Sequence, residues 1–142
     1  MPEGTVSFDV RAPGDRVWAF LSDMRKVGSC VPGVQSVDIH DERRATWNLR
    51  MKIGPLSQAI RVETENIEMI PPSRAKFRGV ADNVDMTGTI VLEPKGEVTT
   101  VTYTMNVQTK GPLARILDNF MRAKLSQQTQ EFAENVKRSL ET

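Results

Sequence analysis

The sequence contains one cysteine and one histidine, and this scarcity excludes several kinds of site. Cys30 has no partner for an internal disulfide, which fits a reducing cytoplasm. It also lacks the second thiol or nearby histidine of a zinc or redox site, so we expect a small buried apolar residue. His40 lies in a polar turn, where we expect a solvated residue rather than the base of a hydrolytic triad. We therefore predict no catalytic residue and no metal site.

An excess of charge of one sign and a long apolar run are also missing. The formal net charge is +1, whereas a basic footprint is the first sign of a nucleic-acid-binding protein. The longest apolar run, 17–21, is far too short to span a bilayer, and no signal peptide is evident at the N-terminus. Glycine-rich phosphate loops are absent, and Asp82 and Asp85 lack the further oxygen ligands of a calcium loop. We expect no nucleic-acid partner and no cofactor.

The length and the balanced composition favour one domain spanning residues 1–142. Alternating apolar residues predict a first strand at 5–10. Apolar residues at helical spacing then predict a short helix that ends at Asp23, and a second helical piece is expected at 25–29. The middle of the chain is best explained as a meander of roughly six strands.

Turn signals predict the pairing of the strands in this meander. A two-residue Gly-Pro turn after Ile53 pairs Trp47 with Val62 and brings the apolar residues of both strands mostly to one face. The Pro-Pro-Ser break that follows is expected to place Glu65 opposite Lys76, as a cross-strand pair of opposite charges on the outer face.

Two later turns predict the remaining registers. A compact Asp-Asn turn pairs Gly79 with Met86. A four-residue Pro-Lys-Gly-Glu turn is expected to place Tyr103 opposite Gly88, which would then be flanked by the rings of Tyr103 and Phe77. A glycine so placed indicates a bend in a curved sheet.

The last element is a helix of about thirty residues, because no breaker follows Gly111-Pro112. Its apolar stripe drifts round the helix, as expected for a helix that crosses a twisted, concave sheet. The element order predicts an α+β fold. In this fold a curved antiparallel sheet of about seven strands carries two short helices after its first strand and a long C-terminal helix over a cavity.

The inner face of this sheet and the helix stripe supply the candidate ligand-binding residues. They are Trp47, Leu49, Met51, Ile60, Val62, Phe77, Gly79, Met86, Gly88, Tyr103, Met105, Leu117, Phe120, Met121 and Lys124. Two interpretations stay open, a cavity or a filled core. The cavity is favoured by the bulk that Gly79 and Gly88 remove and by the polar Lys124 and Gln128 near the centre of the stripe. Alternatively, Lys124 and Gln128 lie beyond the sheet edge and meet water.

Three segments resemble known families. Residues 12–23, APGDRVWAFLSD, resemble the first helix of the helix-grip superfamily, which includes START domains, polyketide cyclases and Bet v 1-like proteins. The Cys30-Val31-Pro32-Gly33 turn and the MKIGPL hairpin at 51–56 are similar to the CoxG family of carbon monoxide dehydrogenase proteins.

This resemblance implies binding rather than catalysis. Such proteins accompany molybdenum hydroxylases of the carbon monoxide dehydrogenase type and are linked to membrane recruitment or to carrying a lipid-like quinone. Many relatives have a C-terminal extension that reaches the membrane, whereas this sequence stops at Thr142, so we expect no membrane anchor of its own. The implied location is the cytoplasm, with peripheral contact at the inner membrane face.

Three hypotheses about function follow. The first is a carrier or accessory domain that binds a hydrophobic small molecule, such as a lipid or quinone, under the C-terminal helix. The second is a cyclase or aromatase, for which Lys124 and Tyr103 are the candidate ionisable groups. The third is an accessory protein that fills its own cavity and binds a protein partner through an apolar patch.

Overall fold

A computed structural model of the chain describes residues 3–53, 55–112 and 114–141. Within these, the side chains of residues 51–53, 56, 58, 117, 120 and 121 are not described. The elements are β1 (Glu3–Val10), α1 (Gly14–Leu21), α2 (Met24–Gly28), β2 (Val34–Ile39), β3 (Arg44–Ile53), β4 (Leu56–Ile70), β5 (Arg74–Ala81), β6 (Val84–Lys95), β7 (Val98–Thr109) and α3 (Ala114–Glu141).

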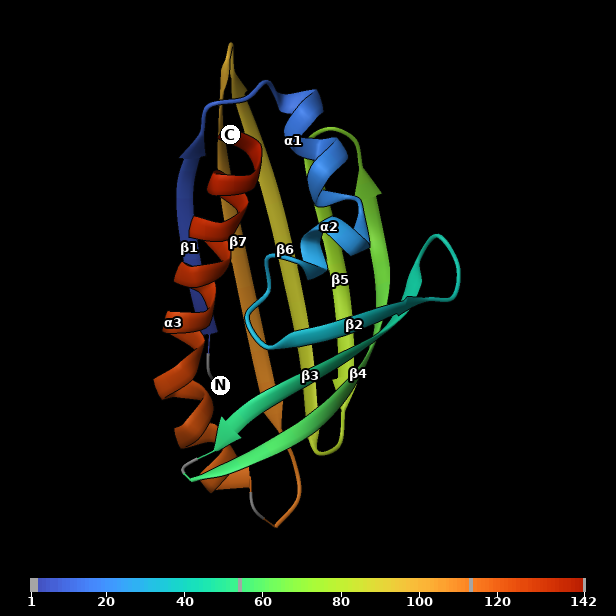
Figure 1. The fold of residues 1–142 in the computed structure, drawn as a ribbon, viewed down its shortest axis with the longest axis vertical. Coiled ribbons are helices and arrows are strands. Elements are labelled where there is room, and N and C mark those ends of the chain that lie inside the picture. The colour runs from blue at the N-terminus through green and yellow to red at the C-terminus, as the bar shows by residue number, and fades with distance from the viewer. Residues whose placement is uncertain (1–2, 54, 113, 142) are drawn as a thin grey trace.

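The seven strands form one antiparallel sheet in the order β1-β7-β6-β5-β4-β3-β2. The sheet curves strongly, so that β2 and β3 run at a steep angle to β1, β6 and β7 (Figure 1). Helix α3 packs against β1 and β7, and α1 and α2 cover the upper part of the same side. This is the predicted α+β arrangement, with the two short helices directly after the first strand.

The registers around the two shortest predicted turns are confirmed. Trp47 pairs with Val62, and Gly79 pairs with Met86. A two-residue turn leaves no freedom in the pairing of its flanking strands, so the sequence was sufficient at these two hairpins. Asn83 adopts a φ of 61° in the second turn, a conformation that asparagine tolerates better than most residues.

The predicted register between β4 and β5 is wrong. Glu65 pairs with Arg78, and Lys76 lies opposite Glu68. The irregularity between Asn66 and Glu68 adds one residue to β4, and the turn is tighter than expected, because Ser73 N donates to the carbonyl oxygen of Ile70 at 2.8 Å. The opposite charges still meet across the strands, although with different partners.

The predicted pairing of Tyr103 with Gly88 is also wrong. Gly88 pairs with Met105, and Tyr103 pairs with Ile90. The turn consists of two residues rather than four, because the strand pairing continues as far as Lys95. Gly88 is therefore covered by Phe77, as predicted, but not by Tyr103.

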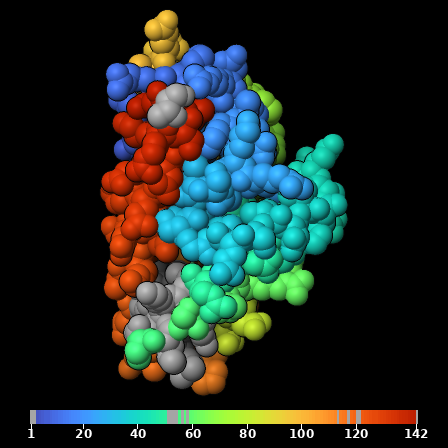
Figure 2. Space-filling model, in the orientation of Figure 1, coloured from blue at the N-terminus to red at the C-terminus, as the bar shows by residue number. Residues whose placement is uncertain are grey.

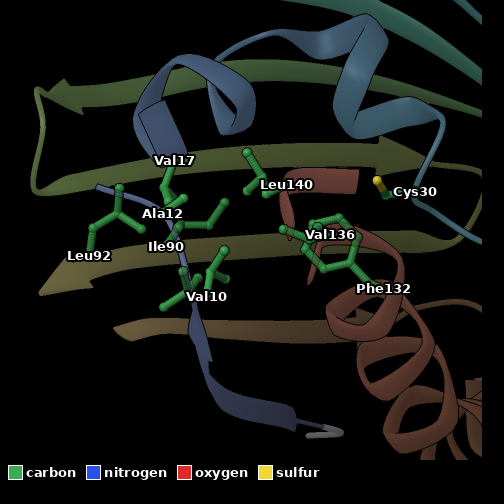
Figure 3. Close-up of a cluster of buried hydrophobic side chains, with 10 residues drawn as sticks. Val10, Ala12, Val17, Cys30, Ile90, Leu92, Phe132, Val136 and Leu140 are labelled. Atoms are coloured by element: carbon green, nitrogen blue, oxygen red, sulfur yellow. The ribbon is translucent and has the colours of Figure 1, made fainter. Parts of the chain in front are cut away.

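The solid hydrophobic core lies at the end of the molecule where α1, the end of α3 and the sheet meet (Figure 3). Val10, Val17 and Val136 are 0% exposed there. Cys30 belongs to this cluster at 1% exposure, as predicted for a small apolar residue. Asn135 Nδ2 donates to its carbonyl oxygen at 2.8 Å, which ties the loop after α2 to α3.

Candidate ligand-binding cavity

Below the core, the sheet and the helices border a cavity of about 270 Å³ that is partly open to solvent. The residues that border it come from α1, α2, the loop after α2, strands β3 to β7 and α3. They are Trp18, Leu21, Ser22, Met24, Val27, Val31, Pro32, Trp47, Leu49, Ile60, Val62, Thr64, Asn66, Met69, Ala75, Phe77, Ala81, Val84, Met86, Ile90, Tyr103, Met105, Val107, Leu125, Gln128, Thr129 and Phe132.

The side chains on the inner face of the sheet are less completely buried than those of the core, and this difference distinguishes the cavity from the core. Large side chains such as Trp47, Phe77 and Met86 keep part of their surface accessible, although they point to the inside of the sheet. A dry core would bury them as fully as Val10 or Val136. The face shown in Figure 2 is nevertheless covered by α3 on one side and by α1, α2 and the β2–β3 region on the other. The inner side chains therefore border an internal space.

Eight of the predicted residues border this cavity. They are Trp47, Leu49, Ile60, Val62, Phe77, Met86, Tyr103 and Met105. The side chains of Met51, Leu117, Phe120 and Met121 lie outside the described residues. Gly79 and Gly88 are on the inner face, but Met86 covers the first and Phe77 covers the second. The two glycines thus make room for neighbouring side chains rather than for a ligand.

The two polar residues of the α3 stripe, Lys124 and Gln128, differ in their position relative to the cavity. Gln128 borders the cavity, whereas Lys124 is not among the bordering residues. At 100° per residue, Lys124 lies about 105° from the centre of the group formed by Leu125, Thr129 and Phe132, which is the flank of the helix. The placement of Lys124 in the cavity is therefore corrected.

One wall of the cavity was not predicted from the sequence. Trp18 and Leu21 of α1, Met24 and Val27 of α2, and Val31 after them border the cavity from the side opposite the sheet. The apolar spacing of the first helix was recognised, but periodicity shows only that a helix has an apolar face and not what that face covers.

The polar groups of the cavity are few and uncharged. The described border contains no aspartate, glutamate, lysine, arginine or histidine. Thr64 accepts a hydrogen bond from Trp47 Nε1 at 2.8 Å and donates to the Ala45 carbonyl oxygen at 3.3 Å. Burial raises the pKa of Tyr103, because the phenolate would be poorly solvated in these surroundings. The cavity can therefore hold an apolar molecule and offer it uncharged hydrogen-bonding groups.

This pKa shift makes alkaline titration a test of the burial of Tyr103. The chain has one tyrosine, so the phenolate absorbance reports Tyr103 alone. We expect no phenolate in the folded protein at pH values near 10, where an exposed tyrosine is half ionised. Because the native state keeps this proton after the unfolded chain has released it, the stabilisation is complete below about pH 10 and is lost as the pH rises further. Absorbance that appears at pH 10 without unfolding would contradict the burial.

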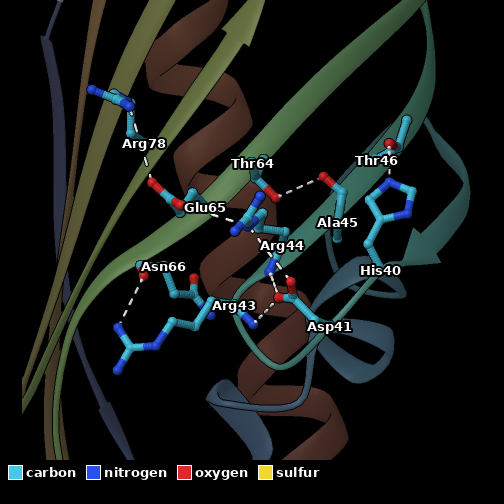
Figure 4. A network of polar contacts seen from close by, with 10 residues as sticks. All are labelled: His40, Asp41, Arg43, Arg44, Ala45, Thr46, Thr64, Glu65, Asn66 and Arg78. Carbon is cyan, nitrogen blue, oxygen red and sulfur yellow. Dashed lines mark hydrogen bonds and ion pairs between the residues drawn. The ribbon is translucent and has the colours of Figure 1, made fainter.

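The outer face of β3, β4 and β5 carries a separate polar network (Figure 4). His40 is exposed, and its Nε2 lies 2.6 Å from Thr46 Oγ1, which donates to Glu63 Oε2 at 2.7 Å. Arg78 and Arg44 pair with Glu65 at 4.0 and 3.8 Å. Arg74 of β5 likewise pairs with Glu68 at 2.9 Å, and exposed pairs of this kind contribute little to stability.

A curved antiparallel sheet closed by a long C-terminal helix over an apolar cavity defines the START and Bet v 1-like helix-grip class. The chain belongs to the carbon monoxide dehydrogenase CoxG family, whose family model matches residues 7–141. No curated protein gives a significant match. Among the described residues, no helix is both long enough and apolar enough to cross a membrane.

Solved structures of low sequence identity share the fold. A conserved protein from Geobacillus kaustophilus is 24% identical with a TM-score of 0.78, covering 97% of this chain and 94% of that one. A START superfamily protein from Mycobacterium smegmatis is 12% identical with a TM-score of 0.74, covering 98% and 97%. The Zhui aromatase/cyclase from Streptomyces sp. R1128 is 16% identical with a TM-score of 0.65, covering 96% and 94%. Together, family and fold suggest binding of a hydrophobic ligand.

Proposed function

We propose that the chain binds a hydrophobic small molecule, of lipid or quinone type, without transforming it. In this role it is a carrier or accessory protein of a molybdenum hydroxylase of the carbon monoxide dehydrogenase type. The observation that carries the proposal is the cavity of about 270 Å³, whose described border has no charged side chain. Membership of the CoxG family supports the choice of partner. A carrier of this kind would work in the cytoplasm and collect its ligand at the inner membrane face.

Two features favour a carrier over a cyclase or aromatase. Proton transfer needs a group whose pKa lies near the working pH, whereas burial moves the pKa of Tyr103 away from neutrality. Lys124, the other ionisable candidate, is not at the cavity. The aromatase/cyclase likeness extends to the fold alone, at 16% identity. An accessory protein with a filled cavity is disfavoured by the open volume itself.

The accessory role is tested with a molybdenum hydroxylase of the carbon monoxide dehydrogenase type. Purified hydroxylase is assayed with the chain loaded with a quinone and with the same chain freed of ligand by solvent extraction. We expect the loaded chain to act as the electron acceptor and the ligand-free chain to be inactive. Equal rates with both forms, and no complex in native mass spectrometry, would contradict the role in this partnership.

A further inference from the structure

Three polar groups at the cavity have hydrogen-bonding capacity that the described protein does not use. They are the hydroxyl of Tyr103 and the side-chain amides of Asn66 and Gln128, none of which has a hydrogen-bond partner among the described residues. Trp18 on α1 adds an indole N–H that also has no partner among the described residues. The hydroxyl groups of Thr64 and Thr129 are engaged, and Thr129 donates to backbone oxygens within α3, at 3.1 Å for Leu125 and 2.9 Å for Ser126. Among the described residues, no fully buried side-chain nitrogen or oxygen atom lacks a hydrogen-bond partner. The unpaired groups of Tyr103, Asn66 and Gln128 therefore each have accessible surface.

These groups lie on three different walls. Tyr103 is on β7, Asn66 on β4 and Gln128 on α3. The ring of Tyr103 is positioned by Phe132, with centroids 5.0 Å apart and planes tilted by 53°. Two aromatic rings in contact restrict each other's rotamers, so the hydroxyl has a defined position. A tyrosine hydroxyl is protonated at neutral pH, so the hydroxyl of Tyr103 can donate a hydrogen bond.

An apolar cavity with a fixed neutral donor selects its ligand by charge. A ligand oxygen that accepts from Tyr103 would satisfy a group that is otherwise unpaired. A carboxylate or phosphate in the same place would lose its hydration without finding a cation, because the described border offers none. The same argument applies to Asn66 and Gln128, whose amides are neutral donors and acceptors.

We infer that the cavity takes an uncharged ligand with a carbonyl or ether oxygen, that Tyr103 recognises this oxygen, and that carboxylates and phosphates are excluded. Tyr103 is thus a specificity-determining residue of the site. The inference rests on the proposed function, since it concerns the ligand that the cavity binds. It divides hydrophobic ligands into two groups: ketones, quinones and other neutral oxygen compounds enter, whereas ionised fatty acids and phospholipid head groups stay outside.

Three naphthalene probes of similar size test the inference by isothermal titration calorimetry at pH 7.5. They are 2-acetylnaphthalene, which has a carbonyl acceptor, 2-ethylnaphthalene, which has no polar group, and 2-naphthoate, which is ionised. We expect 2-naphthoate to bind at least ~100-fold more weakly than 2-acetylnaphthalene, because an unpaired charge is costly to bury. In Tyr103→Phe, we expect the affinity for 2-acetylnaphthalene relative to 2-ethylnaphthalene to fall by about five- to tenfold, as for one lost hydrogen bond.

Thr104→Val is the matched control. It also removes one hydroxyl from β7, but Thr104 is the next residue and its hydroxyl pairs with Thr5 at 3.4 Å on the exposed face. The affinity ratio should be unchanged in this variant. Thermal unfolding provides a second readout, because Tyr103→Phe keeps the ring and removes only an unpaired hydroxyl, so its Tm should equal or exceed that of the wild type.

The outcomes separate the two claims. If the neutral probes bind and the ratio does not change in Tyr103→Phe, or if 2-naphthoate binds as tightly as the ketone, the inference about specificity is overturned and the proposed function stands. If none of the three probes binds the wild-type protein, the proposed function itself fails.

Discussion

Met86→Trp is expected to abolish ligand binding while the protein stays folded. Met86 is on the inner face of β6, borders the cavity and covers Gly79. An indole at this position would extend into a cavity of about 270 Å³ and occupy the space of a small ligand. Because that space is empty of protein, the larger side chain displaces no neighbour. We expect affinity for 2-acetylnaphthalene to fall at least ~100-fold, with a change in the free energy of unfolding below about 1 kcal/mol.

The matched control for this variant is Thr87→Trp, which places the same indole on the next residue of β6 and hence on the outer face. Binding should be unaffected there. The two variants are compared by calorimetry and by chemical denaturation. Unfolding of Met86→Trp would contradict an open cavity, because adding bulk to a filled core typically costs about 1–3 kcal/mol. Normal binding in a folded Met86→Trp would place the ligand elsewhere.

Gly88→Ala is expected to destabilise the protein more than the same change at Gly79, the other glycine on the inner face. A Cβ at Gly88 would overlap the ring of Phe77, which cannot bend and would have to move off the strand as a unit. At Gly79, a Cβ would meet Met86 Cγ at 2.8 Å, but a methionine side chain can change rotamer. We expect a loss of about 2–3 kcal/mol for Gly88→Ala and below about 1 kcal/mol for Gly79→Ala.

A double-mutant cycle identifies the cause of this loss. In Phe77→Leu the ring is gone, so adding Gly88→Ala should cost about 1–2 kcal/mol less than it does in the wild type. Free energies of unfolding from urea titrations provide all four values. If Gly88→Ala costs no more than Gly79→Ala, or costs the same with Leu at position 77, then the packing of Phe77 over Gly88 is not what the structure describes.

The sequence was sufficient for the inner face of the sheet even where it predicted the wrong register. The pairings predicted for Glu65 and Tyr103 are each displaced by two residues from the observed ones. Side chains in a strand alternate between faces with a period of two, so an even displacement keeps residues on their correct face. Phe77, Tyr103 and Met105 therefore border the cavity as predicted, although their neighbours across the strands differ. Beyond the irregularity after Asn66 the displacement in β4 is odd, and Met69 borders the cavity there.

The registers between β4 and β5 and between β6 and β7 could not be obtained from turn residues alone. Proline is usually excluded from the middle of a sheet, so Pro94 suggested the start of a turn. In the structure Pro94 pairs with Thr99 inside the strand ladder. The irregularity before Glu68 has no marker in the sequence, since Ile67 is an ordinary strand residue. At Pro94 the strand pairing overrides a local signal, whereas the irregularity before Glu68 is not marked by any local signal.

The candidate site was predictable on its sheet side and less so on its helical side. Strand alternation assigns a face directly, whereas the face of a long helix changes as it drifts across the sheet. Lys124 was a candidate because it lies near the centre of the helix stripe, although Leu125, Gln128, Thr129 and Phe132 are the α3 residues that border the cavity. The contribution of α1 and α2 depends on how two short helices pack over the open side of the sheet, which no spacing in the sequence specifies.

The central claim is that this cavity holds a hydrophobic molecule, and native mass spectrometry of the purified protein tests it most directly. We expect a second species, heavier than the apo chain by the mass of one neutral molecule, which solvent extraction releases and which is absent from Met86→Trp prepared in parallel. A single apo mass that stays unchanged after incubation with lipids, quinones and the neutral naphthalene probes would contradict the claim.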